Sequence, residues 1–205
     1  MRPAFGICHL MKRSVGKVFS AFGLTQLIML VAVSIALVLA YNPWRWGNVR
    51  DDLMRSFPAN DIIDGATLER WIQHVSGQDS RRKPLILDVR SEAEFAVSHL
   101  PDARHISVGA NITEIGRLIN LDASAAEMRP QVVVYCAVGY ASSEFVDRLK
   151  RLGVARVQML DAGIFRWAND SRPMVNSIGV AVNKVHAGKY SYSGLLDRAF
   201  RAQVK

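Results

Sequence analysis

The sequence has few cysteines and lacks the residue spacing of a metal site. Its 205 residues include two cysteines, Cys8 and Cys136. Neither has a second Cys or a His at metal-ligand spacing, because His9 is too close to Cys8 to form such a pair. A long apolar segment, residues 22–40, separates the two cysteines, so a disulfide between them would have to cross a membrane. We therefore expect a free thiol at Cys136, no metal and no cofactor.

Acidic residues are absent from the first 20 residues, and the net charge of +8 is concentrated in the flanks of the chain. Residues 1–20 hold four Lys or Arg and no acid, and residues 171–205 hold six Lys or Arg against Asp197. The remaining residues, 21–170, carry a net charge of −1. Basic flanks around a nearly neutral centre suit a membrane surface better than a DNA groove. Nucleic acid is therefore not an expected partner, and the hydrophobic content of 50% excludes a disordered chain.

Charge is absent from the stretch Phe22–Ala40, which is rich in Leu, Ile and Val. As a helix its 19 residues would be about 28 Å long, close to the roughly 30 Å of a hydrocarbon core. It is followed by side chains typical of a membrane interface, namely Tyr41, Trp44, Arg45 and Trp46. We expect a retained transmembrane anchor, and a signal peptide cleaved after Val38, Leu39 and Ala40 is the alternative.

The chain is expected to consist of five segments: a basic N-terminal segment (1–21), a transmembrane helix (22–40), a tether (41–60), a folded domain (61–170) and a basic C-terminal extension (171–205). Four basic residues precede the span and three follow it, which favours an outward-facing domain on a single-pass protein of a bacterial inner membrane. If translation began at Met11, this excess of basic residues before the span would disappear. The extension is expected to fold back on the domain or to contact the membrane surface.

Hydrophobic periodicity predicts an α/β domain. Helical patterns cover residues 66–75, 92–99, 112–119, 142–152 and 163–167, and strand patterns cover residues 84–89, 105–108, 131–135 and 157–160. Strands that alternate with helices at this spacing imply right-handed crossovers. The predicted fold is therefore a central parallel sheet with helices on both faces.

Cys136 stands directly after the most apolar strand and before a helix, with Gly139 in the turn between them. In an open α/β sheet, ligands collect at the carboxyl ends of the strands. A short turn there directs backbone N–H groups inward, and the helix dipole adds to them. These N–H groups would stabilise the thiolate of Cys136 itself before any anionic ligand enters the turn. We interpret Cys136 as a nucleophile, and a small apolar side chain in the core is the alternative.

Three stretches resemble motifs of the rhodanese (sulfurtransferase) family over roughly residues 61–170. LILDVRSEAEFAVSHLPDARHI resembles the family's D-V-R followed by E-x-x-x-G-H-I-P-G-A, with Ser98 and Asp102 in place of the glycines. VVVYCAVGYAS resembles the active loop C-x-x-G-x-R. RLGVARVQMLDAGIFRW resembles the closing G-x-x-x-V-x-x-L-x-G-G-x-x-x-W, with Ala162 in place of a Gly. The order and spacing of these stretches match the family, which implies its three-layer fold.

The resemblance implies transfer of sulfane sulfur. The thiolate would attack a small sulfur-donor anion such as thiosulfate, or a persulfide, and pass the outer sulfur to a nucleophilic acceptor, including a protein. By position, Cys136 would be the nucleophile, with its persulfide surrounded by amides of the loop residues Ala137, Val138, Gly139, Tyr140 and Ala141. Asp88 and Arg90, in the matching D-V-R, would brace this loop or form an ordinary structural ion pair. Tyr140 would line the pocket, contact an acceptor or have no role.

One loop position departs from the family, because Ala141 stands where the family has Arg. Without that guanidinium, the bidentate grip on an oxyanion is lost, so we expect weak turnover of thiosulfate. Arg104, Arg166 or a cation from a partner could replace it. The fold-related cysteine phosphatases need C-x5-R, and Ser142 at that position argues against phosphatase activity. Two hypotheses remain, a membrane-anchored sulfurtransferase or persulfide carrier and a rhodanese-fold binding or redox-sensing module.

Overall fold

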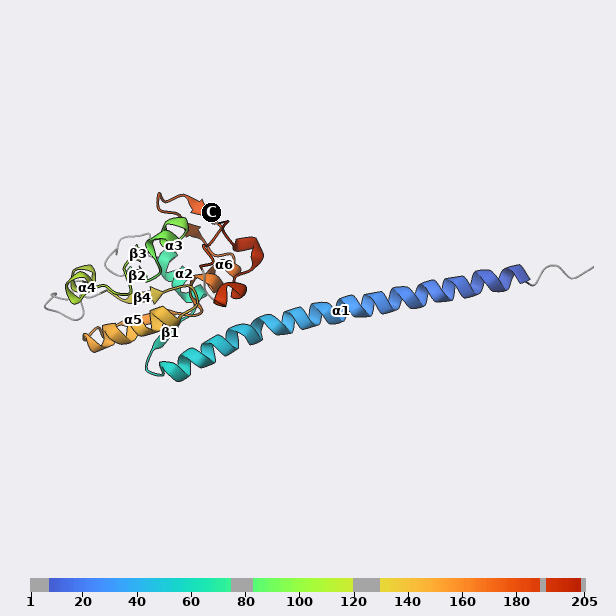
Figure 1. Ribbon diagram of the computed structural model, residues 1–205, viewed down its shortest axis with the longest axis horizontal. Helices are drawn as coiled ribbons and strands as arrows, with labels where there is room; N and C mark the ends of the chain where they lie inside the picture. Colours follow the sequence, from blue (N-terminus) through green and yellow to red (C-terminus); the bar gives the residue numbers. More distant parts are fainter. Residues whose placement is uncertain (1–7, 75–82, 120–129, 189–190, 204–205) are drawn as a thin grey trace, which may run out of the picture. The chain divides into compact units, whose positions relative to one another are not determined.

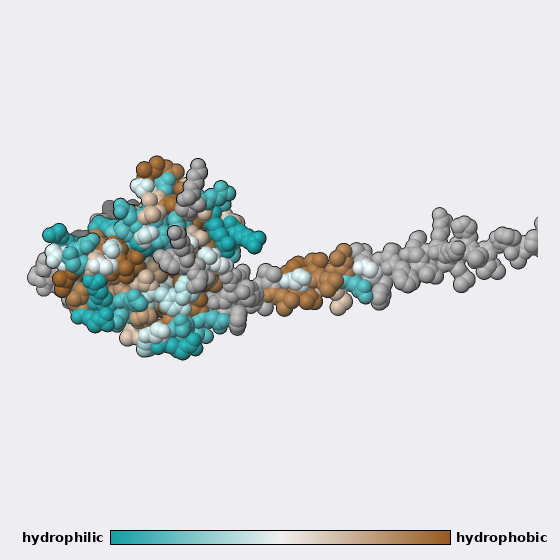
Figure 2. All heavy atoms as spheres, in the orientation of Figure 1, coloured by the Kyte–Doolittle hydropathy of each residue, from teal (hydrophilic) through white to brown (hydrophobic). Residues whose placement is uncertain are grey.

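The computed structural model describes residues 8–74, 83–119, 130–188 and 191–203, and the chain divides into two units, residues 1–45 and 46–205. Helix α1 (Cys8–Ser56) contains the uncharged stretch found in the sequence. Large apolar side chains described between Leu27 and Leu37 are 51–68% exposed, and they form the brown part of this helix in Figure 2. In the part of the chain that the structure describes, no helix combines the length and the apolar character of a membrane span. The predicted transmembrane helix is thus not supported by the structure.

The second unit is built on a five-stranded parallel sheet. Its strands are β1 (Asp61–Ile63), β2 (Leu85–Asp88), β3 (Arg104–His105), β4 (Val132–Tyr135) and β5 (Val157–Leu160), in the order β1-β5-β4-β2-β3. Strand β4 is central and buried along its whole length, as its uncharged β-branched sequence predicts. The α/β fold with a central parallel sheet is confirmed.

The sheet is covered by helices on both faces. These are α2 (Gly65–His74), α3 (Glu92–Val97), α4 (Ile112–Ile119), α5 (Tyr140–Arg151) and α6 (Gly163–Asn169). Right-handed crossovers that run from β1 to β2 to β3 put α2 and α3 on one face, and the return through β4 to β5 puts α4 and α5 on the other. Figure 1 shows this arrangement, with α6 on the side of α2 and α3. The predicted helices and the observed ones differ by a few residues at their ends.

The end of α1 belongs to the second unit and differs from the expected tether. Residues 47–56 are helical, and Val49 and Leu53 are buried in the core. Two apolar side chains four residues apart are too few to show a helical period in the sequence. The strand predicted at 105–108 is also shorter in the structure, because β3 ends at His105.

The C-terminal extension folds back on the domain, as one of the two alternatives predicted. It forms an antiparallel hairpin of β6 (Met174–Val175) and β7 (Ala181–Val182) and two short 3-10 helices, η3 (Ser191–Leu195) and η4 (Arg198–Phe200). Val185, Leu195 and Leu196 are buried in the core of the unit. A backbone pair between His99 and Val175 joins the hairpin to the end of α3. The extension therefore contributes to the folded unit and to the cavity described next.

Candidate active site

Cys136 lies at the carboxyl end of β4, where the sequence places it. Its side chain is a free thiol, 5% exposed, and it borders an open cavity of about 580 Å³. The N–H of Gly139 donates to Cys136 Sγ at 3.1 Å. The hydroxyl of Ser142 lies 3.6 Å from the same sulfur. The thiol therefore faces a cavity and has polar donors on it, which is not the environment of a side chain that only fills the core.

The turn after Cys136 is held by two serines of α5. Gly139 adopts a φ of 125°, which favours glycine, and its carbonyl oxygen accepts hydrogen bonds from the hydroxyls of Ser142 and Ser143, each at 2.9 Å. The α-helix begins immediately afterwards, at Tyr140. Of the predicted loop amides, the recorded donor to the sulfur is Gly139. The other predicted loop residues, Ala137, Val138, Tyr140 and Ala141, line the cavity.

The carbonyl groups of the loop are held by the start of α6. The N–H of Ile164 donates to Cys136 O at 3.0 Å, and the N–H of Phe165 donates to Ala137 O at 3.1 Å. Gly163 makes this approach possible, because its φ is 56° and a Cβ there would lie 2.3 Å from Cys136 O. These bonds direct the two carbonyls toward α6 and fix the orientation of the loop. Sequence analysis did not connect Gly163 with the thiol.

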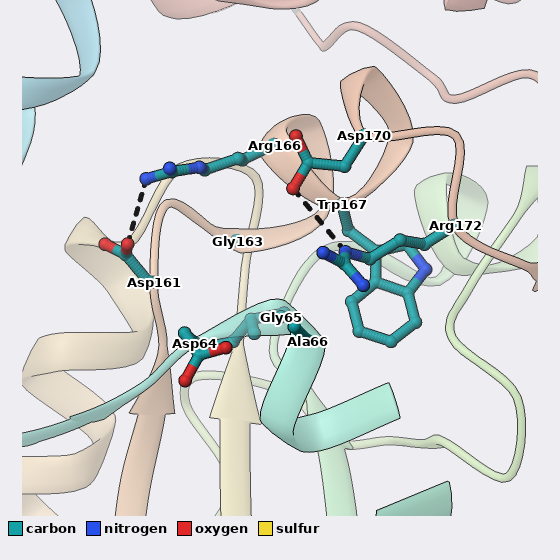
Figure 3. Close-up of a pocket in the computed structure, with 10 residues that line it drawn as sticks. Asp64, Gly65, Ala66, Asp161, Gly163, Arg166, Trp167, Asp170 and Arg172 are labelled. Carbon is teal, nitrogen blue, oxygen red and sulfur yellow. Dashed lines mark hydrogen bonds and ion pairs between the residues drawn. The ribbon is translucent and has the colours of Figure 1, made fainter. Parts of the chain in front are cut away.

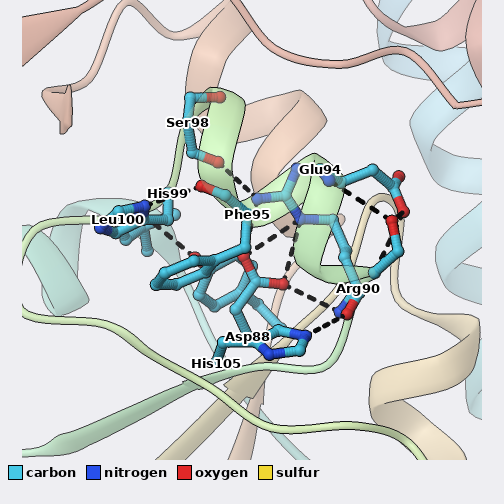
Figure 4. A network of polar contacts seen from close by, with 10 residues as sticks. Asp88, Arg90, Glu94, Phe95, Ser98, His99, Leu100 and His105 are labelled. Atoms are coloured by element: carbon cyan, nitrogen blue, oxygen red, sulfur yellow. Dashed lines mark hydrogen bonds and ion pairs between the residues drawn. The ribbon is translucent and has the colours of Figure 1, made fainter. Parts of the chain in front are cut away.

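Asp88 and Arg90 form a buried ion pair beside the loop (Figure 4). Arg90 Nη2 donates to Asp88 Oδ2 at 2.7 Å and to Ser98 O at 2.6 Å, which joins the end of β2 to the end of α3. Burial opposes the charged guanidinium, but the carboxylate of Asp88 outweighs this effect and raises the pKa of Arg90. The N–H of Val89, between the two residues, donates to Tyr135 O at 3.0 Å. The geometry is that of a structural ion pair next to the strand that carries Cys136.

Tyr140 connects the cavity with two distant segments of the chain. Its hydroxyl donates to Asp52 Oδ2 at 2.6 Å, and Asp52 belongs to the last turns of α1. Its ring stacks on that of Tyr192 in η3, with centroids 5.1 Å apart and planes at 24°. Burial raises the pKa of Tyr140, and Asp52 raises it further. Of the roles considered for Tyr140, the structure supports lining the cavity.

Neither arginine named as a replacement for the missing guanidinium lines the thiol cavity. Ala141 is half-buried there, whereas Arg104 is exposed on β3. Arg166 lies at a second cavity, of about 110 Å³, next to the ends of β1 and β5, where it pairs with Asp161 at 3.0 Å (Figure 3). Arg172 also lines this second cavity and pairs with Asp170 at 3.5 Å. Both arginines of this cavity are therefore paired with carboxylates that also line it.

Among the residues described by the structure, no group of three His, Cys, Asp or Glu side chains has the arrangement of a metal site. The features of the thiol site that sequence analysis missed are Asp52, Gly163 and Tyr192. Asp52 and Tyr192 lie far from Cys136 in the sequence, and no local pattern connects them with the loop. The single usable signal was the closing motif of the family resemblance, which contains Gly163.

Comparisons with known proteins agree with this fold. A model of the rhodanese-like domain family matches residues 71–170. A sulfurtransferase from Allochromatium vinosum is 32% identical over 91 residues, which cover 44% of this chain and 78% of that protein. The probable adenylyltransferase/sulfurtransferase MoeZ from Mycobacterium tuberculosis is 29% identical over 130 residues, which cover 62% of this chain. The chain belongs to the rhodanese-like domain family.

The aligned region covers 29% of the length of MoeZ. Among solved structures, a rhodanese-related protein from Thermoplasma volcanium is 21% identical, with a TM-score of 0.41, and the match covers 56% of this chain and 97% of that one.

Proposed function

We propose that the chain is a sulfurtransferase or persulfide carrier in which Cys136 holds the transferred sulfur. The observation that carries this proposal is the position of the thiol, which borders a cavity at the carboxyl end of β4 and accepts a hydrogen bond from the N–H of Gly139. Hydrogen-bond donors on a sulfur favour its anionic form, which is the nucleophile. Sulfurtransferases among the relatives support the same chemistry.

In the first step, the thiolate of Cys136 attacks the sulfane sulfur of a donor. The bond between that sulfur and the rest of the donor breaks, and the leaving group departs with its electron pair. The enzyme then carries a persulfide, whose outer sulfur is attacked by an acceptor nucleophile in a second step that restores the thiolate. The hydroxyl of Ser142 and the N–H of Gly139 would stabilise negative charge on the inner sulfur.

The experiment is to incubate the full chain with thiosulfate and with an organic persulfide and to measure its intact mass. We expect a gain of one sulfur atom with the persulfide, absent in Cys136→Ser, and slow or no gain with thiosulfate because of Ala141. Because serine is close to cysteine in volume, Cys136→Ser should fold as wild type does, and circular dichroism checks this. If no donor adds sulfur, the site is a binding or redox-sensing module and the proposal fails.

We also infer that the apolar stretch of α1 attaches the protein to a membrane, with the domain facing outward. The support is the uncharged sequence from Phe22 to Ala40 and the exposure of its described apolar side chains. Exposed apolar side chains in such number are costly in water and favourable in hydrocarbon. On this proposal, the sulfur acceptor would be a molecule or protein at that membrane.

A further inference from the structure

Two tyrosine rings line the cavity that Cys136 faces. Tyr140 comes from the start of α5, and Tyr192, 36% exposed, comes from η3 of the C-terminal extension. The hydroxyl of Tyr140 is engaged with Asp52, which leaves the carbon surface of its ring to face other groups. Aromatic rings paired in this way offer a large, rigid and mainly apolar contact surface. The extension thus adds a second aromatic ring, that of Tyr192, to the ring that Tyr140 supplies from the loop.

The remainder of the cavity is also mainly apolar around the thiol. Val89, Val108, Val138 and Ala141 line it together with the two tyrosines. Val108 is 46% exposed, although it lies beside a buried site. A cavity of this size and composition is suited to an organic group rather than to a small inorganic ion.

The charges at this cavity do not favour an oxyanion. Among the described residues that line it, Arg90 is the one Lys or Arg, and its side chain is 2% exposed and paired with Asp88. Glu92, exposed at the start of α3, adds a carboxylate to the same cavity. His105, the one histidine among the described lining residues, directs its Nε2 to the carbonyl oxygen of Arg90 at 2.8 Å. A dianion would therefore lose its hydration here without gaining a free cation.

We propose that this cavity selects organic persulfides, R–S–SH, whose R group is uncharged and apolar, and that Tyr192 is a specificity-determining residue. The R group would pack against the rings of Tyr140 and Tyr192 while the outer sulfur reaches Cys136 Sγ. This inference rests on the proposed function of Cys136 and names the class of its donor. It assigns a role to the C-terminal extension, which lies beyond residues 71–170 matched by the family.

The transfer balances without an added oxidant or reductant. The Cys136 thiolate attacks the outer sulfur of R–S–SH, and the S–S bond of the donor breaks as the new bond to Cys136 Sγ forms. R–S⁻ leaves with the electron pair of the broken bond, and the hydrogen stays on the transferred sulfur. The apolar cavity holds R until it departs as the thiolate, which then takes a proton from water.

The test compares three donors on the full chain, with loading of one sulfur followed by intact mass over time. We expect benzyl persulfide to load about tenfold faster than methyl persulfide, which lacks the apolar body, and thiosulfate to be the slowest. Tyr192→Ala should remove most of the difference between the two persulfides, whereas Tyr192→Phe, which keeps the ring, should preserve it. Ile178→Ala, at a residue 80% exposed in the same extension, is the control and should leave all three rates unchanged.

A second variant tests the charge argument without depending on the fold of η3. Glu92→Lys should raise the rate for thiosulfate relative to benzyl persulfide by about fivefold, because a cation replaces the carboxylate at the cavity. The specificity proposal is overturned if thiosulfate is the fastest donor, if benzyl and methyl persulfides load equally fast, or if a folded Tyr192→Ala keeps the preference. In those cases sulfur still adds to Cys136 and the proposed function stands. If no donor adds sulfur, the proposed function itself fails.

Discussion

Gly163 is the residue at which the loop of Cys136 depends most on the absence of a side chain. The N–H groups of the next two residues in α6, Ile164 and Phe165, donate to the carbonyl oxygens of Cys136 and Ala137, so the two segments are in direct contact. A Cβ at Gly163 would lie 2.3 Å from Cys136 O and 2.7 Å from Ala137 O, and both are backbone atoms that cannot rotate away. Position 163 is therefore constrained by close packing as well as by its φ.

We expect Gly163→Ala to destabilise the protein more than Gly153→Ala does. Gly153 also has a positive φ, of 83°, but nothing lies within 4 Å of a Cβ built there. Gly153→Ala should cost about 1–2 kcal/mol from backbone conformation alone, and Gly163→Ala should cost about 1–3 kcal/mol more from overpacking. Urea unfolding followed by tryptophan fluorescence measures both. Equal losses of unfolding free energy in the two variants would show that the loop moves away from the added Cβ without cost.

Helix α2 shows how a local sequence signal sets the start of an element next to a strand. Asp64 follows β1 directly, and its carboxylate accepts hydrogen bonds from the N–H of Thr67 at 2.9 Å and from the Thr67 hydroxyl at 2.7 Å. This is the geometry of a helix N-cap. The hydrogen bonds from Thr67 lower the pKa of Asp64 below its usual range. The charged form of this residue therefore stabilises the folded state.

Asp64→Ala should lower the free energy of unfolding by about 0.5–2 kcal/mol at neutral pH, the usual cost of losing an N-cap. Because the pKa of Asp64 is depressed by folding, its contribution is present above the pKa of the unfolded chain, near 3.9, and is lost as the pH falls through the lower folded value. Asp64→Asn keeps an acceptor for Thr67 but does not titrate. We expect this control to be nearly as stable as wild type at pH 7 and to lack the acid-dependent loss attributable to position 64. If Asp64→Ala and wild type unfold identically at pH 7, the cap contributes nothing.

Most basic residues of the chain lie outside the lining of the thiol cavity. The net charge of +8 arises in the two ends of the chain, whereas the cavity lining holds Glu92 and a neutralised Arg90. The basic segment 1–20 precedes the apolar stretch in the sequence, which suits attachment to an anionic surface.

The membrane proposal predicts that the full chain stays with membranes after alkaline carbonate extraction. Replacing both Val31 and Ile35 by Lys should release it, because each Lys near the centre of a span costs about 2.5–3.5 kcal/mol. Both wild-type side chains are exposed apolar groups of α1, at 51% and 55%. The control is Ile178→Lys, at an exposed apolar residue of the domain, which should remain with the membrane. Recovery of the wild-type chain in the extract would contradict the proposal.

A large part of the fold and the centre of the site could be predicted from local patterns. The run VVVY is long and β-branched enough to specify a buried strand, and the Gly139 turn placed Cys136 at its carboxyl end. Strand β1 was not predicted, because the three residues of Asp61–Ile63 are too short to show an alternation. The hairpin of β6 and β7 has two residues in each strand and escaped prediction for the same reason. Short elements gain their stability from the neighbours on which they pack.

The sequence by itself determined the family, the alternation of β2 to β5 with helices and the place of Cys136 directly after a strand, because these depend on residues close together in the chain. The tertiary structure alone brought Asp52, Gly163 and Tyr192 to the loop of Cys136. It also placed Arg166 at a different cavity, paired with Asp161. Contacts between distant segments follow from how the core packs, and no local spacing encodes them. The set of residues that line the cavity was therefore decided by the fold as a whole.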